Sequence, residues 1–275
     1  MGTFPTAILV AVAVWWAATG AVFLAVRLGG TRVNRVLVGA TVMASAGFAG
    51  LYFSASMQSV AGTYLAFASA IAVWAWHETA FLLGFLTGPR KTPCPEGLSG
   101  FRRFRAAFET IRDHELALAA TIAVCAVAIW QQPNRFGLWT LILLWVMRIS
   151  TKLNIFLGAP NSLNELLPKR LGHLTSYFRT DSINPFFSMT LAAAVMVFGA
   201  ATHQAYLAAA AHAAAGWTLL AVFAALAIVE HLFLVLPIRD SALWTWLLPA
   251  DRPAAGDESV AGKDPISKSG GMSWT

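Results

Sequence analysis

The chain has 275 residues, of which 57% are hydrophobic and only 12% are charged. A soluble globular domain carries about 25% charged residues, so this composition excludes an ordinary soluble domain. The net charge is +6, but the basic residues lie in short segments between long apolar runs, where they act as topology signals. We therefore expect an integral membrane protein that binds no nucleic acid.

Apolar runs follow one another along most of the chain. A run of about 20 residues, at 1.5 Å rise per residue, matches a hydrocarbon core of roughly 30 Å. The sequence predicts an all-α, polytopic transmembrane helical bundle of about seven spans, at residues 5–26, 36–55, 60–86, 115–130, 136–157, 185–202 and 206–236. No basic segment or clear cleavage site marks the first run as a signal peptide, so it is expected to be retained as a span.

The basic residues predict the orientation of these spans. With the N-terminus outside, 18 of the 19 Lys and Arg residues fall in segments on the inner side, and only Arg135 falls on the other. Cytoplasmic loops carry this excess of basic residues, so we expect the N-terminus out and the C-terminus in. An odd number of spans is required for that arrangement.

The sequence divides into a membrane domain and a tail. Residues 1–249 are predicted to form the transmembrane helical domain, and residues 250–275, rich in Gly, Ser, Pro and charges, a disordered cytoplasmic tail. Residues 97–113 alternate aromatic and basic side chains, which predicts an amphipathic cytoplasmic segment on an anionic leaflet or, alternatively, a solvated loop helix. Residues 158–184 are expected to form a long cytoplasmic loop, a kind of loop that is often functional.

Ionisable residues inside the predicted spans are few, and each costs roughly 2.5–3.5 kcal/mol to insert. Arg148 and Lys152 lie at the inner end of the fifth span, and neighbouring His and Glu residues occur in the third, fourth and seventh spans. These neighbours are His77, Glu78, His114, Glu115, Glu230 and His231. The topology, which rests on Lys and Arg alone, places all six near the cytoplasmic face. We therefore expect one polar site that faces the cytoplasm.

Three imidazoles and three carboxylates would suit a non-haem iron or another divalent metal, although no cofactor is certain. The spacing matches neither the Glu-x-x-His motif of di-metal bundles nor the spaced histidine boxes of membrane desaturases. Two structural alternatives remain open. Asp113, His114 and Glu115 would also suit the first turn of a helix, where carboxylates favour the dipole. The other pairs would also serve as hydrogen bonds between helices.

The stretch after the fifth span is the most distinctive. It reads Lys152-Leu-Asn-Ile-Phe-Leu-Gly-Ala-Pro-Asn161, then Asn164-Glu165-Leu-Leu-Pro168, then His173-Leu-Thr-Ser-Tyr-Phe178. It resembles the photosynthetic complex assembly protein 2 family, also called PuhE, and the resemblance extends over most of residues 1–240. Glu165 and His173 add two candidate ligands, on a loop that would close over the polar site. A surface loop capped by its own Asn side chains is the alternative.

The resemblance implies a membrane factor for assembly or accumulation of the photosynthetic reaction centre–light-harvesting complex in a phototrophic bacterium, without an established catalytic mechanism. The expected location is the bacterial inner membrane, cytoplasmic or intracytoplasmic. The expected partners are membrane lipids, reaction-centre or light-harvesting subunits, and a pigment or quinone. Whether the protein is an enzyme stays open. The alternative is a membrane di-metal enzyme acting on a lipophilic pigment or quinone, and a proton-coupled transporter ranks last because no inverted repeat is present.

Overall fold

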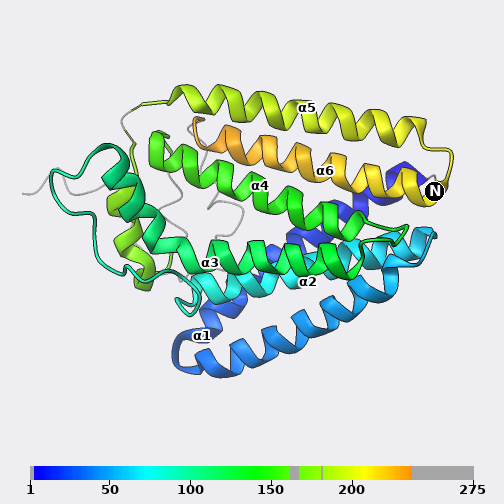
Figure 1. Ribbon diagram of the computed structural model, residues 1–275, viewed down its shortest axis with the longest axis horizontal. Coiled ribbons are helices and arrows are strands. Elements are labelled where there is room, and N and C mark those ends of the chain that lie inside the picture. The colour runs from blue at the N-terminus through cyan, green and yellow to red at the C-terminus, as the bar shows by residue number, and fades with distance from the viewer. Residues whose placement is uncertain (1–2, 162–166, 181, 237–275) are drawn as a thin grey trace, which may run out of the picture.

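The computed structural model describes residues 3–161, 167–180 and 182–236, and most of these are helical (Figure 1). The elements are α1 (Thr3–Ala55), α2 (Val60–Leu82), α3 (Gly100–Ala128), α4 (Phe136–Leu157), the 3-10 helix η2 (Lys169–Tyr177), α5 (Pro185–Leu207) and α6 (Ala211–Phe233). The prediction of an all-α bundle is confirmed. The predicted tail at residues 250–275 lies outside the described residues.

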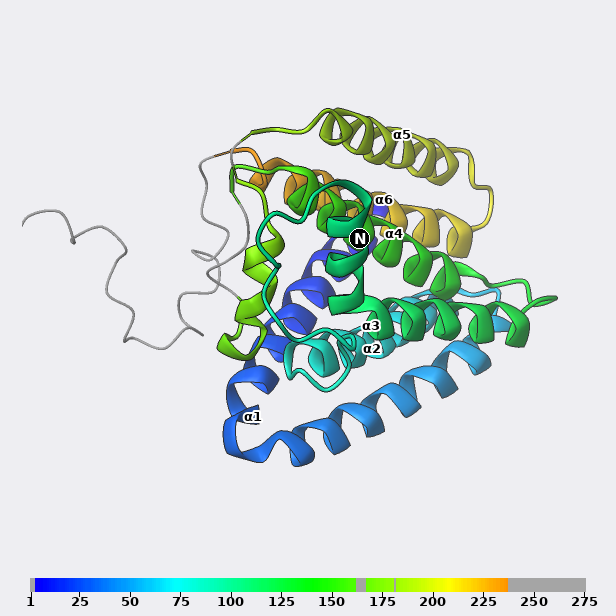
Figure 2. The ribbon, with the colours of Figure 1, turned by 60° about the vertical axis from the view of Figure 1, so that its left-hand side comes forward.

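Helix α1 is a helical hairpin rather than one straight rod. Its backbone leaves helical geometry at Arg32 (φ −120°, ψ 26°), and Figure 2 shows its two halves diverging from this bend. The halves, Thr3–Gly30 and Arg32–Ala55, are longer than the predicted spans because the basic segment between them is itself helical. Gly29 packs so closely on Leu83 that an added Cβ would collide with the Leu83 side chain.

Six helices are long and apolar enough to cross a membrane: both halves of α1, then α2, α4, α5 and α6. The predicted span at residues 115–130 is not among them, because it forms the second half of α3, whose first half is charged. This half nevertheless lies along the bundle in both views (Figures 1 and 2). Its Leu118 and Cys125 pack in one core cluster with Val73 and Leu141.

The continuity of α3 corrects one sequence interpretation. Residues 97–113 and 115–130 were predicted as separate elements, but no Gly or Pro separates them, and one helix runs through both. His114 and Glu115 therefore lie in the middle of α3, and the interpretation that they form a first helical turn is wrong. The outer part of this helix exposes an aromatic row of Phe101, Phe104 and Phe108.

The ends of helices α2, α5 and α6 differ from the predicted ends by a few residues. Helix α2 ends at Leu82, four residues early, because Gly84 adopts a left-handed conformation (φ 69°) that terminates helices. Helix α5 continues to Leu207 and α6 begins at Ala211. The turn between α5 and α6 falls within an alanine-rich stretch that lacks Gly and Pro, so no sequence signal marks it.

Helices α2 and α6 lie at the centre of the bundle. Helix α2 contacts α1, α3, α4 and α6, whereas α5 lies at the outer edge against α6 and α4 (Figure 1). Phe67 of α2 and Phe223 of α6 stack edge to face at 4.9 Å between ring centroids. Alanines such as Ala194 and Ala201 let α5 approach its neighbours closely.

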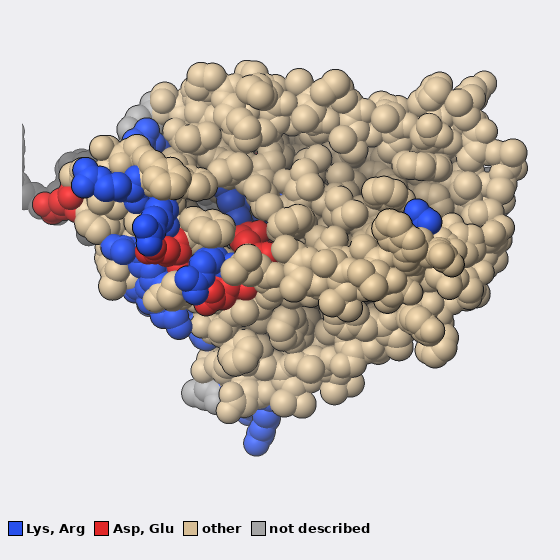
Figure 3. Space-filling view, in the orientation of Figure 1, with Lys and Arg blue, Asp and Glu red and all other residues tan. Residues whose placement is uncertain are grey.

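Charged side chains gather at one end of the bundle, which we call the basic end (Figure 3). The α1 bend, the α2–α3 connection and the α4–α5 connection lie there. The α3–α4 turn lies at the opposite end and carries Arg135. This distribution matches the orientation predicted from the positive-inside rule, and the membrane side of each end stays a prediction.

The α2–α3 connection is wedged against the backbone of α3 at Gly88. A Cβ at this position would collide with the Glu109 carbonyl oxygen and lie 2.7 Å from the carbonyl carbon of Thr110. Backbone atoms have little room to yield, so we expect Gly88→Ala to lower the free energy of unfolding by about 1–3 kcal/mol. Denaturation of the purified protein in detergent measures this. Gly172→Ala is the control, since open space surrounds Gly172, and an equal loss in both variants would contradict the prediction.

Candidate functional site

Arg148 of α4 joins three helices near the basic end. Its Nη1 donates to Glu230 Oε1 of α6 at 2.8 Å, and its Nη2 donates to Glu78 Oε2 of α2 at 3.4 Å. The Glu78 side chain is 11% exposed, and those of Arg148 and Glu230 are 32% and 35% exposed. In an apolar medium such a charge must be paired. Arg148 therefore fixes the relative positions of α2, α4 and α6.

Lys152 forms a second ion pair one turn further along α4. Its Nζ lies 2.5 Å from Glu115 Oε1 of α3, and Trp145 Nε1 donates to the other carboxylate oxygen, Oε2, at 3.0 Å. The Lys152 ammonium also lies 5.3 Å from the centroid of the Phe81 ring, in cation–π geometry. Residues 148 and 152 are four apart and share one face of α4, so this face carries both cations.

The two cations face three carboxylates, those of Glu78, Glu115 and Glu230. If all five groups are ionised, the cluster carries one negative charge in excess. Glu78 Oε1 is buried and makes no hydrogen bond within the described residues. Glu78 Oε1 can therefore accept a hydrogen bond from one further polar ligand while Oε2 keeps its ion pair with Arg148.

Two histidines lie beside this cluster, one from α2 and one from α3. The rings of His77 and His114 are 6.3 Å apart between centroids, and both residues are almost fully buried, at 3% and 0% exposure. His77 Nε2 bonds the hydroxyl of Thr121 at 3.1 Å. The His77 Nδ1 atom and both ring nitrogens of His114 have no hydrogen-bond partner in the part of the chain that the structure describes.

Unpartnered ring nitrogens are costly in this setting, at about 1–3 kcal/mol for each buried polar group left unsatisfied. The surroundings of His114 are apolar and aromatic, with the Phe81 ring 4.7 Å away. The position of His114 is set from outside its own helix, because its backbone N–H donates to the Thr87 carbonyl at 2.9 Å. A buried polar group that is held but unsatisfied is the kind of feature that marks functional sites.

His231 has a different role from the other two histidines. Its Nδ1 bonds the Ala227 carbonyl at 2.8 Å, and its Nε2 bonds the Ser150 hydroxyl at 2.7 Å. A carbonyl only accepts, so Nδ1 carries the hydrogen and, in the neutral ring, Nε2 accepts from the hydroxyl. Both nitrogens are occupied, and His231 bonds α6 to α4. This is the interhelical role that the sequence left open.

Of the two loop residues in the prediction, the structure describes only His173. Glu165 is outside the described residues. His173 lies on η2, and its Nε2 is buried without a hydrogen-bond partner within the described segments. η2 does cover the ends of α2 and α3, but through Leu171 and Leu174 packed on Phe81 rather than through His173. Arg103 fixes η2 to α3 by donating to the Tyr177 carbonyl at 2.5 Å.

Stability is expected to depend weakly on pH through His173. Burial, and then the nearby Lys91 charge, lower the pKa of His173 below its ordinary value. The unfolded chain then binds the proton more readily, so the folded state should lose stability as the pH falls below about 6.5. Solvent screening keeps the effect below about 1 kcal/mol. Denaturation of wild type and His173→Gln at pH 7.5 and 5.5 measures it, and the same acid loss in both would contradict this assignment.

The described residues contain no group of three or more His, Cys, Asp and Glu side chains that could hold a metal ion. The geometry gives the reason. The three carboxylates are paired with Arg148 and Lys152, and both nitrogens of His231 are occupied. A metal site built from the predicted residues, Glu165 among them, stays a prediction.

Sequence reasoning placed six residues at one level, and the structure brings all six into this layer: His77, Glu78, His114, Glu115, Glu230 and His231. The sequence pattern places Arg148 and Lys152 at the inner end of the fifth span but not among the site residues, and it does not single out Trp145, Thr121 or Ser150. These five residues supply most of the bonds of the site. The spacing of Arg148 and Lys152 carried a signal, because two cations on one face of an apolar helix require buried carboxylate partners. The roles of Trp145, Thr121 and Ser150 had no such signal.

Comparison with known proteins gives a family but no described activity. Residues 1–255 match a family described as "Protein of unknown function (DUF3623)". The chain is 38% identical over 266 residues to the "Uncharacterized 30.4 kDa protein in puhA 5'region" of Rhodobacter capsulatus, a match that covers 94% of this chain and 97% of the relative. No solved structure matches the chain.

Proposed function

The chain belongs to the DUF3623 family, and from this premise we propose that it is a membrane factor for assembly or accumulation of the photosynthetic reaction centre–light-harvesting complex. Two observations support the process. The relative from Rhodobacter capsulatus carries the puhA 5' region in its name, which points to a photosynthesis gene region. The residue 152–178 stretch resembles the PuhE family. The expected location is the photosynthetic membrane of a phototrophic bacterium.

The choice of site rests on one observation. A buried histidine without a hydrogen-bond partner among the described residues lies beside an ion cluster in which three carboxylates face two cations. Among the described residues, no hydrogen-bond partner is present for His77 Nδ1, Glu78 Oε1 or either ring nitrogen of His114. They lie between α2 and α3, and both helices are held by cations on α4. We propose that this layer binds a polar group of a pigment, a quinone or a complex subunit during assembly.

The process is tested by deletion and complementation in a phototrophic host. Loss of the gene should lower the absorbance of assembled reaction centre–light-harvesting complex, and the wild-type gene should restore it. The tagged protein should also co-purify with reaction-centre or light-harvesting subunits. Normal levels of assembled complex in the deletion strain would refute the proposal.

The site is tested by His114→Phe, a substitution that removes the ring nitrogens and keeps an aromatic ring of similar size. Because the His114 side chain makes no hydrogen bond to any residue that the structure describes, this variant should fold at least as stably as wild type and still fail to restore the complex. His203→Phe, at an exposed position on α5, is the matched control and should complement fully. Full complementation by His114→Phe would contradict the site while leaving the assembly role standing.

The second candidate is a membrane enzyme in which a metal acts on a lipophilic pigment or quinone. The unpartnered nitrogens of His77 and His114 favour it, since a neutral imidazole is the commonest metal ligand. This candidate requires that the purified wild-type protein contain stoichiometric metal and that the Glu78→Ala variant lose it. Elemental analysis measures the metal content of both proteins. Metal-free protein that still supports assembly would exclude this candidate.

A further inference from the structure

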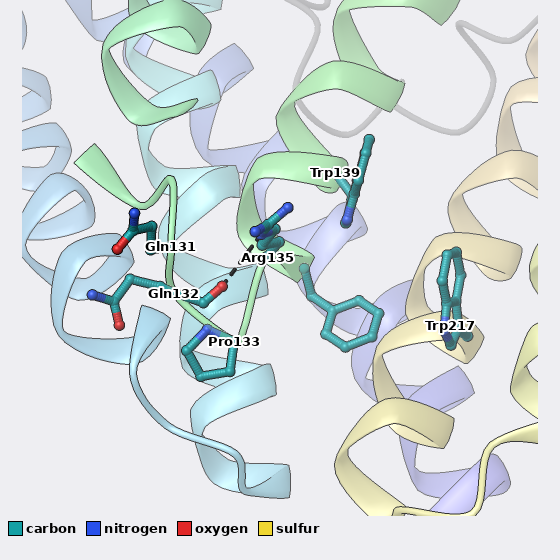
Figure 4. A pocket seen from close by; sticks show the side chains of 7 residues that line it. Gln131, Gln132, Pro133, Arg135, Trp139 and Trp217 are labelled. Carbon is teal, nitrogen blue, oxygen red and sulfur yellow. Dashed lines mark hydrogen bonds between the residues drawn. The ribbon is translucent and has the colours of Figure 1, made fainter. Parts of the chain in front are cut away.

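A cleft of about 450 Å³ opens at the end of the bundle opposite the basic end (Figure 4). It lies between the α3–α4 turn, the start of α4 and α6. Its lining includes Gln132, Arg135, Phe136, Trp139 and Trp217. None of these residues belongs to the histidine and ion-pair layer, so the cleft is a separate feature of the molecule.

The Arg135 guanidinium is held in place from one side. Its Nε donates to the Gln132 carbonyl at 3.3 Å and its Nη2 donates to the Trp130 carbonyl at 2.7 Å. Its Nη1 makes no hydrogen bond within the described residues. Both bonds are to neutral backbone acceptors, so they orient the group without compensating its charge.

No carboxylate accompanies this cation in the described part of the chain. The ion pairs of that part all involve other basic residues, and Figure 3 shows no acidic side chain near the isolated basic one at this end. A positive charge on this side also runs against the positive-inside rule. An unpaired guanidinium at a membrane boundary attracts an anion, and its planar fork matches phosphate.

The other walls of the cleft are aromatic. Phe136 and Trp217 meet edge to face, with 5.7 Å between ring centroids, and Trp139 is 45% exposed. Tryptophan rings of this kind favour the level of lipid head groups, with apolar bodies in contact with chains. The cleft therefore combines one fixed cation with amphipathic walls.

We propose that this cleft binds the head group of an anionic phospholipid, with its phosphate on Arg135 and its glycerol region between Trp139 and Trp217. The charge pattern selects an anionic over a zwitterionic lipid. A choline or ethanolamine group would bring a second cation to an end where the described residues offer no carboxylate to receive it. A net negative head group neutralises Arg135 instead.

Native mass spectrometry of the full-length protein, purified in detergent and titrated with phosphatidylglycerol or phosphatidylcholine, tests the proposal. Wild type should retain phosphatidylglycerol in preference to phosphatidylcholine. Arg135→Gln should weaken phosphatidylglycerol binding roughly tenfold, the size expected for loss of one charge-assisted hydrogen bond. Trp139→Ala should also weaken binding, although it changes no charge. Arg35→Gln removes an exposed charge at the basic end and should leave this binding unchanged.

Three results would overturn the proposal. Equal retention of the two lipids would remove the selectivity for an anionic head group. Undiminished phosphatidylglycerol binding by Arg135→Gln, or an equal loss of binding in Arg35→Gln, would show that the lipid does not bind at Arg135. Competition by glycerol 3-phosphate at the same concentration as the lipid would assign the cleft to a soluble phosphate compound rather than to a lipid.

Discussion

Arg148→Gln is expected to be the most damaging single substitution in the bundle, lowering the free energy of unfolding by about 3–5 kcal/mol. Glutamine removes the cation that Glu78 and Glu230 share, so two carboxylates on α2 and α6 lose their partner in an apolar setting. The effect should reach beyond stability, because Arg148 fixes α2 beside the histidines. Denaturation in detergent and the yield of folded protein in membranes measure the loss.

Neutralising both glutamates in the same variant separates the effect of the lost charge from the effect of the changed side-chain size. The triple variant Arg148→Gln with Glu78→Gln and Glu230→Gln has no unpaired charge left in this half of the cluster and should recover a large part of the lost stability. Arg135→Gln is the matched control, because it makes the same change at an exposed site outside the cluster and should leave stability near that of wild type. A triple variant less stable than Arg148→Gln alone would show that unpaired carboxylates are not the cause.

Lys152→Met should have the second largest effect, a loss of about 3 kcal/mol. Methionine keeps the length of the side chain and most of its packing on Phe81, but it leaves the Glu115 carboxylate, 9% exposed, with Trp145 as its hydrogen-bond donor. The double variant with Glu115→Gln should be more stable than Lys152→Met alone, since the surplus charge is gone. A double-mutant cycle measured by denaturation then gives the coupling energy of the pair.

The cycle has a clear negative outcome. If the losses of Lys152→Met and Glu115→Gln simply add in the double variant, the two side chains are not coupled and the ion pair does not hold α3 to α4. Coupling of roughly 2 kcal/mol is expected for a pair this close in a low-dielectric setting. The result also bears on the proposed site, because Glu115 follows His114 on α3 and its pairing limits how α3 can rotate.

The sequence by itself determined the class of protein and the level of the site. Length and hydropathy of the runs specify membrane helices, since a span needs little more than about 20 apolar residues. Rare ionisable residues in those runs specify a polar layer, because their insertion is costly unless they meet one another. The positions of Lys and Arg specify one basic end. These signals are local in the chain. The described structure agrees with the all-helical bundle, the polar layer and the basic end, although residues 115–130 are not among its six candidate spans.

Tertiary structure decided which side chains meet. The spacing of residues in the sequence shows which of them share one face of a helix. It does not show how that helix is rotated relative to its neighbours, because this rotation depends on the packing between helices. Arg148 could have met either Glu115 or Glu78, and only the approach of α2, α4 and α6 assigns it to Glu78 and Glu230. The same approach occupies His231 and leaves His114 unsatisfied. The histidines of two His–Glu pairs that look alike in sequence thus have opposite roles. His231 bonds two helices together, whereas His114 keeps ring nitrogens without a partner among the described residues, available for a ligand in the proposed site.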